Sequence, residues 1–172
     1  ADPPDVQLIE RSAMPSSSAP DLPDAELPDA ELRGKVLYIE DVDVNFVMVE
    51  GGLASFPGIT LIRATTGLEG VRLVRSERPD FVLLDMHLPD ISGLDVVRQL
   101  SEDIATHRLR VTILTGDELN MDVIKAMSLG AFEYWIKPVD VRVLRAGVRR
   151  ALNGHRPDPA RTLKAQEPPM PD

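Results

Sequence analysis

The stretch FVLLDMHLPDISG, residues 81–93, runs four apolar residues directly into an aspartate, Asp85, and then into a Pro–Asp turn that ends at Gly93. A short apolar run bounded by turn residues predicts a strand buried on both faces, as the strands of parallel sheets are. A carboxylate at the end of such a strand is costly to bury unless another group compensates its charge. The explanation for Asp85 therefore has to come from the rest of the chain.

Strand-like and helix-like segments alternate on both sides of this stretch. The predicted strands are residues 35–40, 59–64, 80–85, 110–115 and 132–136. The predicted helices follow them at residues 43–56, 67–77, 92–102, 120–130 and 140–152. Five strand–helix units in a row predict an α/β fold, a doubly wound five-stranded parallel sheet with five helices and the strand order 2-1-3-4-5.

Local signals refine three of the helices. Asp43 is expected to be the N-cap of the first helix. Leu68, Val71 and Val74 recur at near-helical spacing and are expected on one apolar face of the second helix. Gly130 suits the position that follows the end of a helix.

The two ends of the chain differ in composition from its middle. Residues 1–33 are rich in Pro, Ser and acids and contain the repeat LPDAELPDAEL. Such a segment buries too little apolar surface to offset its ordering entropy, so we expect a flexible N-terminal extension, with a short helix through Ala25 to Leu32 as the alternative. The folded domain is predicted at residues 34–153, and the Pro-rich residues 154–172 are predicted to be a flexible C-terminal tail.

Charge and composition exclude several functions. The 172 residues carry a formal net charge of −9, which argues against nucleic acid and against an anionic membrane surface as partners. The chain has no cysteine, so disulfides and thiolate metal sites are excluded. No apolar run approaches the roughly 18 residues that a membrane span requires. We expect a cytoplasmic protein.

Three acids should meet at one edge of the predicted sheet. Glu40 and Asp41 end the first strand and Asp85 ends the third, and these strands are neighbours at the point where the strand order reverses. Like charges that close destabilise one another, and a divalent cation removes the problem. Hard oxygen ligands completed by waters suit Mg²⁺. The alternative is that one or two of these acids simply cap the following helices.

Two further groups are expected beside these acids. Thr115 and Gly116 end the fourth strand and offer a hydroxyl and a backbone N–H to an anion. Lys137 ends the fifth strand, and a cis bond to Pro138 would turn the lysine back toward the acids. Acids with a metal, a hydroxyl and a lysine are the set that a phosphorylated aspartate requires, with Asp85 as the nucleophile.

Four stretches in order, VLYIEDVDVN, FVLLDMHLPDISGLDVVRQL, VTILTG and GAFEYWIKPVD, resemble the receiver domain of two-component response regulators. The resemblance covers about residues 34–153 and implies a flavodoxin-like fold. It implies that Asp85 accepts a phosphoryl group from the phosphohistidine of a sensor histidine kinase or a histidine phosphotransferase. Asp41, Asp85 and the backbone carbonyl of His87 would ligate Mg²⁺, and Glu40 would act through water.

The resemblance also implies roles around the phosphoryl group. Its oxygens would be bound by Thr115 and Lys137 and by the backbone N–H groups of Met86 and Gly116. Tyr134 would be the aromatic switch that turns inward when Thr115 moves. The charge of Asp117 and the bulk of His87 are expected to set the lifetime of the phosphoryl group. The output or homodimer surface would be about Asn120 to Leu152.

The favoured function is a signalling switch with intrinsic phosphotransfer and slow autodephosphorylation, and not an enzyme. A phosphatase with an aspartate nucleophile commonly needs a second acid two residues later, where this chain has His87. A pseudo-receiver, which binds partners without phosphorylation, remains the alternative, although such proteins normally lack an acid or the lysine. We expect no attached output domain, and the sequence leaves open whether the chain is a stand-alone receiver or part of a hybrid kinase.

Overall fold

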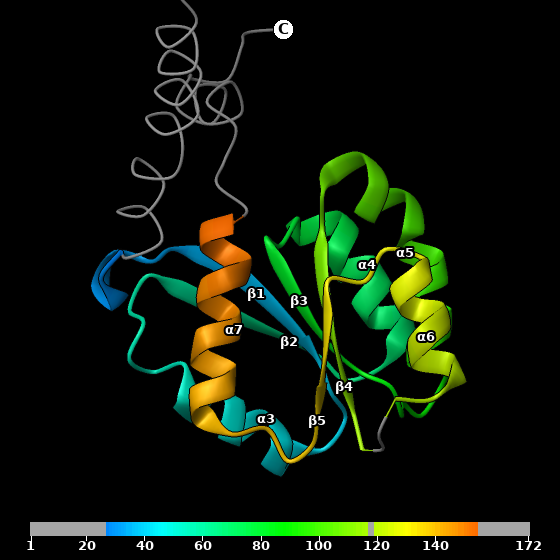
Figure 1. The fold of residues 1–172 in the computed structure, drawn as a ribbon, viewed down its shortest axis with the longest axis horizontal. Helices are drawn as coiled ribbons and strands as arrows, with labels where there is room; N and C mark the ends of the chain where they lie inside the picture. The colour runs from blue at the N-terminus through cyan, green and yellow to red at the C-terminus, as the bar shows by residue number, and fades with distance from the viewer. Residues whose placement is uncertain (1–26, 117–118, 155–172) are drawn as a thin grey trace, which may run out of the picture.

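The computed structural model describes residues 27–116 and 119–154, and these form a single parallel sheet covered by helices on both faces (Figure 1). The strand order is β2-β1-β3-β4-β5, as the sequence predicts. The strands are β1 (Gly34–Ile39), β2 (Ile59–Ala64), β3 (Phe81–Asp85), β4 (Arg110–Thr115) and β5 (Glu133–Ile136). Within the described residues there are five α-helices and one 3₁₀ turn: α3 (Asp43–Gly52), α4 (Gly67–Glu77), α5 (Gly93–His107), α6 (Met121–Ser128), α7 (Val141–Gly154) and η1 (Asp29–Glu31).

The helices divide into two layers, with α3 and α7 on one face of the sheet and α4, α5 and α6 on the other (Figure 1). Each strand has a period of two, so its residues alternate between these layers. In β1, Leu37 and Ile39 belong to the core under α4, α5 and α6, whereas Val36 and Tyr38 belong to the core under α3 and α7. The continuous burial of these strands follows from this double cover.

The register of the central strands positions the site. Ile39 of β1 pairs with Leu84 of β3, so the next residues of the two strands, Glu40 and Asp85, lie at the same edge of the sheet. On the other side of β3, Asp85 pairs with Leu114 of β4, and Thr115 follows it. The carboxyl ends of three adjacent strands therefore meet at one place.

Side-chain caps begin three of the helices. Thr66 accepts from the Glu69 N–H at the start of α4, Ser92 from the Asp95 N–H at the start of α5, and Asn120 from the Val123 N–H at the start of α6. The N-cap prediction for Asp43 was wrong, because α3 begins at Asp43 itself and its N-cap is Val42, without a side-chain cap. The carboxylate of Asp43 instead pairs with Arg63 at 2.8 Å.

The apolar face of α4 also differs from the prediction. Val71 and Val74 are buried, but Leu68 is 53% exposed. The inward positions of this helix include Gly67 and Gly70, and a Cβ at Gly70 would lie 2.4 Å from the Ile39 side chain. Glycine therefore lets α4 lie close to β1, and Leu68 lies outside the buried stripe of Gly67, Gly70, Val71 and Val74. Gly130 has a φ of +113°, which confirms its predicted place after α6.

Part of the N-terminal extension is described, and it packs on the domain. Leu32 is only 2% exposed and belongs to the core under α3 and α7. Asp29, in η1, forms ion pairs with Arg145 and Arg149 of α7. Of the alternative helix, the structure describes only the short turn η1, because Ala25 lies outside the described residues. The same holds for the rest of residues 1–26 and for the predicted tail after residue 154. The domain bounds 34–153 stay a prediction. In the part of the chain that the structure describes, no helix is long and apolar enough to cross a membrane.

Candidate functional site

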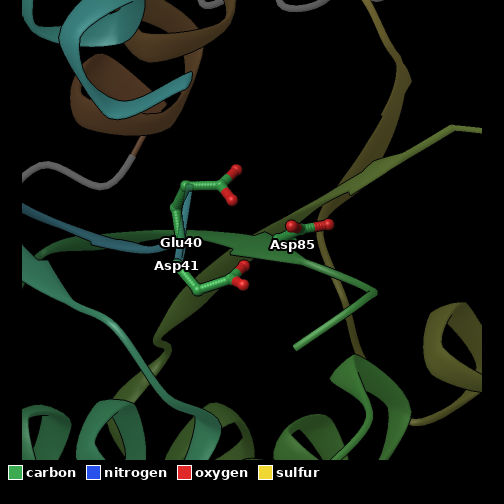
Figure 2. Close-up of side chains that lie close together, drawn as sticks. All are labelled: Glu40, Asp41 and Asp85. Atoms are coloured by element: carbon green, nitrogen blue, oxygen red, sulfur yellow. The ribbon is translucent and has the colours of Figure 1, made fainter. Parts of the chain in front are cut away.

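The three acids predicted to converge do so. Oxygen atoms of Glu40, Asp41 and Asp85 all lie within 4.8 Å of one another. Figure 2 shows Glu40 and Asp41 reaching from the end of β1 toward Asp85 at the end of β3. Glu40 is 0% exposed and Asp85 is 3% exposed, whereas Asp41 is open to solvent. Two buried carboxylates and one exposed carboxylate therefore share one small space.

Lys137 is the cation that faces this cluster. Its Nζ lies 2.9 Å from Asp85 Oδ1 and 3.9 Å from Glu40 Oε1. The backbone N–H of Lys137 donates to the Thr115 carbonyl at 2.8 Å, and the Lys137–Pro138 peptide bond is cis, as expected from the sequence. One ammonium compensates only part of the charge of three carboxylates.

The carboxylate of Glu40 is held by neighbouring donors. Oε1 accepts from the Tyr38 hydroxyl at 2.9 Å and from Asn45 Nδ2 at 3.3 Å. Oε2 accepts from the Val42 N–H at 3.1 Å. Burial raises the pKa of Glu40 above its ordinary value, and the charge of Asp85 adds to the rise, although the Val42 N–H opposes it. Burial and then the charge of Glu40 raise the pKa of Tyr38 far above its ordinary value, so this phenol stays a proton donor.

The donor set suits a hard divalent cation. Every candidate side-chain ligand is a carboxylate oxygen, and the carboxylate of Asp41 has no hydrogen bond or ion pair to any described residue. Burial, and after it the charge of Asp85, disfavour the ionised form of Glu40 and raise its pKa. A small divalent ion would supply the missing positive charge, and oxygen ligands are those that Mg²⁺ prefers. The residues present therefore fit Mg²⁺.

A backbone N–H group donates to Asp85 at the edge of the site. The His87 N–H donates to Asp85 Oδ1 at 3.1 Å, whereas the Met86 N–H donates to the Leu114 carbonyl of β4 at 3.2 Å. The predicted phosphate contact of Met86 stays a prediction, and this geometry favours the His87 N–H as the donor beside Asp85. Thr115 is buried at the end of β4, and Gly116 is exposed beside it.

Two predicted residues lie at the margin of the site or beyond the described chain. Tyr134 is half-buried and packs against the core under α4, α5 and α6. Its neighbour Trp135 points to the opposite core, because adjacent residues of a strand face opposite sides of the sheet, and its Nε1 donates to Glu133 Oε1 at 2.9 Å. Asp117 lies outside the described residues.

Sequence reasoning did not single out Tyr38, although it touches Glu40. The signal was present, because residues 38 and 40 are two apart on a strand and share a face.

The structure also has a cavity of about 290 Å³ beside Lys137, which the sequence could not show. Its apolar lining comes from α3, from α7 and from the segment after β5, and includes Met48, Val139 and Leu144.

The comparisons with known proteins agree with this geometry. The family model of the response regulator receiver domain matches residues 36–149. The chain belongs to this family. It is 36% identical over 117 residues to the transcriptional regulatory protein AfsQ1 of Streptomyces coelicolor, covering 68% of this chain and 50% of that protein, so the chain spans half the length of this relative.

Two further matches cover almost the whole of the other chain. Protein PilH of Pseudomonas aeruginosa is 31% identical over 120 residues, covering 70% of this chain and 98% of PilH. The crystal structure of the receiver domain of sensor histidine kinase PA1611 from Pseudomonas aeruginosa superposes with a TM-score of 0.61 at 25% identity, covering 71% of this chain and 98% of that chain. That domain is described with a magnesium ion coordinated in its active site cleft.

Proposed function

We propose that this receiver domain is a phosphorylation switch whose acceptor is Asp85. The observation that carries the proposal is the position of the Asp85 carboxylate, buried at the end of β3 between the ammonium of Lys137 at 2.9 Å and the acids that follow β1. The phosphodonor would be the phosphohistidine of a sensor histidine kinase or of a histidine phosphotransferase. We also propose that the protein works in the cytoplasm.

The transfer needs little covalent chemistry from the protein. A carboxylate oxygen of Asp85 attacks the phosphorus in line, and the P–N bond to the donor imidazole breaks. The electron pair stays on the imidazole nitrogen, which takes up a proton. Lys137 would offset the charge of the phosphoryl group. Its oxygens would accept hydrogen bonds from the Thr115 hydroxyl and from the N–H groups of His87 and Gly116.

A magnesium ion is the proposed cofactor. Asp41 and Asp85 would hold it together with the backbone carbonyl of His87, and Glu40 would accept hydrogen bonds from its waters. When bound, the ion supplies positive charge that lets an anionic carboxylate approach an anionic phosphoryl group. The magnesium described for the related PA1611 receiver domain supports this assignment.

The proposed response is a change in the surface formed by α6, β5 and α7. Thr115 would move toward the phosphoryl group, and Tyr134 would turn inward. This surface carries exposed apolar side chains at Met121, Ile124, Leu129, Ile136 and Val143. Such a surface suits a downstream protein or a second copy of the chain. His87 and Asp117 remain our candidates for control of the rate at which the acyl phosphate hydrolyses.

The deciding experiment is intact-mass spectrometry of the full chain after incubation with Mg²⁺ and acetyl phosphate. We expect one phosphoryl adduct on the wild type, none after chelation of the metal, and none on Asp85→Asn. Asp122→Asn, an aspartate change on α6, is the matched control and should retain the adduct.

An adduct of equal yield on Asp85→Asn would refute the acceptor. If the wild type forms no adduct, beryllofluoride with Mg²⁺ replaces acetyl phosphate, and amide NMR shifts at Asp85, Thr115 and Lys137 are measured. Unmoved shifts would reject the switch in favour of a receiver that works without phosphorylation.

A further inference from the structure

A hydrogen bond between two buried side chains stands behind the acid cluster. The Tyr38 hydroxyl donates to Glu40 Oε1 at 2.9 Å, and Tyr38 is only 2% exposed. The phenol ring belongs to the core under α3 and α7, so it is fixed by packing while its hydroxyl reaches the cluster. The distance of two residues along β1 places both side chains on the same face of the strand.

A second set of contacts fixes the ring of Tyr38. The ring of Phe46, on α3, stacks against it with centroids 6.0 Å apart and planes at 24°. The guanidinium of Arg63 lies over the ring of Phe46, 5.0 Å from its centroid. Arg63 is the β2 residue that pairs with Tyr38, and its Nε donates to the Glu40 backbone carbonyl at 3.0 Å. Glu40 is therefore held through its backbone by Arg63 and through its side chain by Tyr38.

Packing alone does not explain the hydroxyl. A phenylalanine at position 38 would fill the same core with the same ring, without the cost of burying a hydroxyl. Among the described residues, the hydrogen-bond partner of this hydroxyl is the carboxylate of Glu40. Glutamate has one more rotatable bond than aspartate, so a carboxylate on this longer arm needs a fixed donor to keep one position.

We propose that Tyr38 is a positioning residue that holds the Glu40 carboxylate toward a cation bound by Asp41 and Asp85. Loss of the hydroxyl would leave Glu40 Oε1 with Asn45 at 3.3 Å and Lys137 at 3.9 Å as its remaining polar neighbours. The glutamate arm would regain rotamer freedom that cation binding must then remove. This inference rests on the proposed function, because it assumes that the cluster binds Mg²⁺.

The test is a calorimetric Mg²⁺ titration of the full chain in a double-mutant cycle. Substitution of groups that orient metal ligands commonly weakens metal binding by about 10-fold or more, so we expect about a 10-fold higher Kd for Tyr38→Phe. Glu40→Gln should weaken binding at least as much. The double variant should bind no more weakly than Glu40→Gln, because the hydroxyl acts only through that carboxylate.

A matched control removes a different buried hydroxyl. Thr112 lies in the interior of β4, and its Oγ1 has no hydrogen-bond partner among the described residues. Thr112→Val should leave the Kd for Mg²⁺ unchanged within twofold. If Tyr38→Phe proves too unstable to titrate, Asn45→Ala, which removes the other donor to Oε1, should raise the Kd about threefold.

The kinetics of phosphorylation by acetyl phosphate give a second readout. For Tyr38→Phe, the Mg²⁺ concentration for half-maximal rate should rise about 10-fold, while the rate at saturating Mg²⁺ should stay within twofold of the wild type. A general disturbance of the fold would lower the saturated rate instead and would overturn the proposal. A Kd unchanged in a folded Tyr38→Phe variant would also overturn it, while leaving the proposed function intact. Failure of the wild type to bind Mg²⁺ would refute both.

Discussion

Replacement of Asp41 by asparagine should change the stability of the protein in opposite directions with and without Mg²⁺. Asp41 is exposed, makes no hydrogen bond or ion pair with any described residue, and lies within 4.8 Å of oxygens of Glu40 and Asp85. Asp41→Asn removes one negative charge from this cluster without breaking an ion pair. In the absence of metal, the variant should therefore be more stable than the wild type.

The size of the gain follows from Coulomb's law. At 4.8 Å, two unit charges interact by about 0.9 kcal/mol in bulk water and by about 3.5 kcal/mol at an effective dielectric constant of about 20. Asp41 faces solvent, so its two repulsions lie near the lower value. We expect Asp41→Asn to raise the free energy of unfolding by about 1–2 kcal/mol without metal.

Magnesium should reverse this order. A ligand present at about 100 times its Kd stabilises the folded state by about 2.7 kcal/mol. The wild type gains this amount, whereas the variant lacks a proposed ligand and gains little. At saturating Mg²⁺ the wild type should therefore be the more stable protein.

Urea unfolding followed by circular dichroism, in chelator and in excess Mg²⁺, measures both free energies. Glu50→Gln, the same change of charge at an exposed position of α3, is the control and should show no such crossing. The reasoning is refuted if Asp41→Asn is less stable than the wild type in chelator. Equal stabilisation of both proteins by Mg²⁺ would refute the ligand assignment.

Three further outcomes concern the fold and are read by thermal or urea unfolding. Thr112→Val should be neutral or stabilising by about 1 kcal/mol, because it replaces an unpartnered buried hydroxyl by a methyl group, and a loss above 1 kcal/mol would contradict this. Gly147→Ala should destabilise by about 2 kcal/mol, because its Cβ would lie 2.0 Å from the Trp135 ring, and an unchanged Tm would show that the contact relaxes freely. Hydrogen bonds from Arg150 lower the pKa of Glu133 below its ordinary value of 4.5. The ionised Glu133 therefore stabilises the fold above pH 4.5, and this stabilisation is lost as the pH falls through the lowered pKa. Glu133→Gln should therefore cost about 0.5–1 kcal/mol at pH 7, and this difference should vanish in acid; a difference that persists in acid would contradict the ion pair.

The convergence of Glu40, Asp41 and Asp85 could be predicted because it depends on topology alone. Parallel strands end at the same edge of a sheet, so acids at the ends of neighbouring strands must meet once the strand order is known. The end of α6 before Gly130 could also be predicted from a single residue, because a positive φ is readily adopted only by glycine.

The contacts around Glu40 could not be predicted in the same way. The pairing of Tyr38 with Arg63 across β1 and β2 depends on register, and the contacts of the Phe46 ring with both side chains depend on how α3 packs. The contribution of β2 to the site was missed for this reason, since no pattern within one segment reports the register between two strands.

The sequence by itself determined the order of strands and helices, the edge at which the acids meet and the family to which the chain belongs. The period of the apolar residues and the identity of the residues that end each strand can both be read within short segments of the sequence. Only the tertiary structure decided which side chains hold the acids, which face of α4 turns inward and how Asp29 meets α7. These contacts join residues far apart in the chain, and close packing of whole elements selects them.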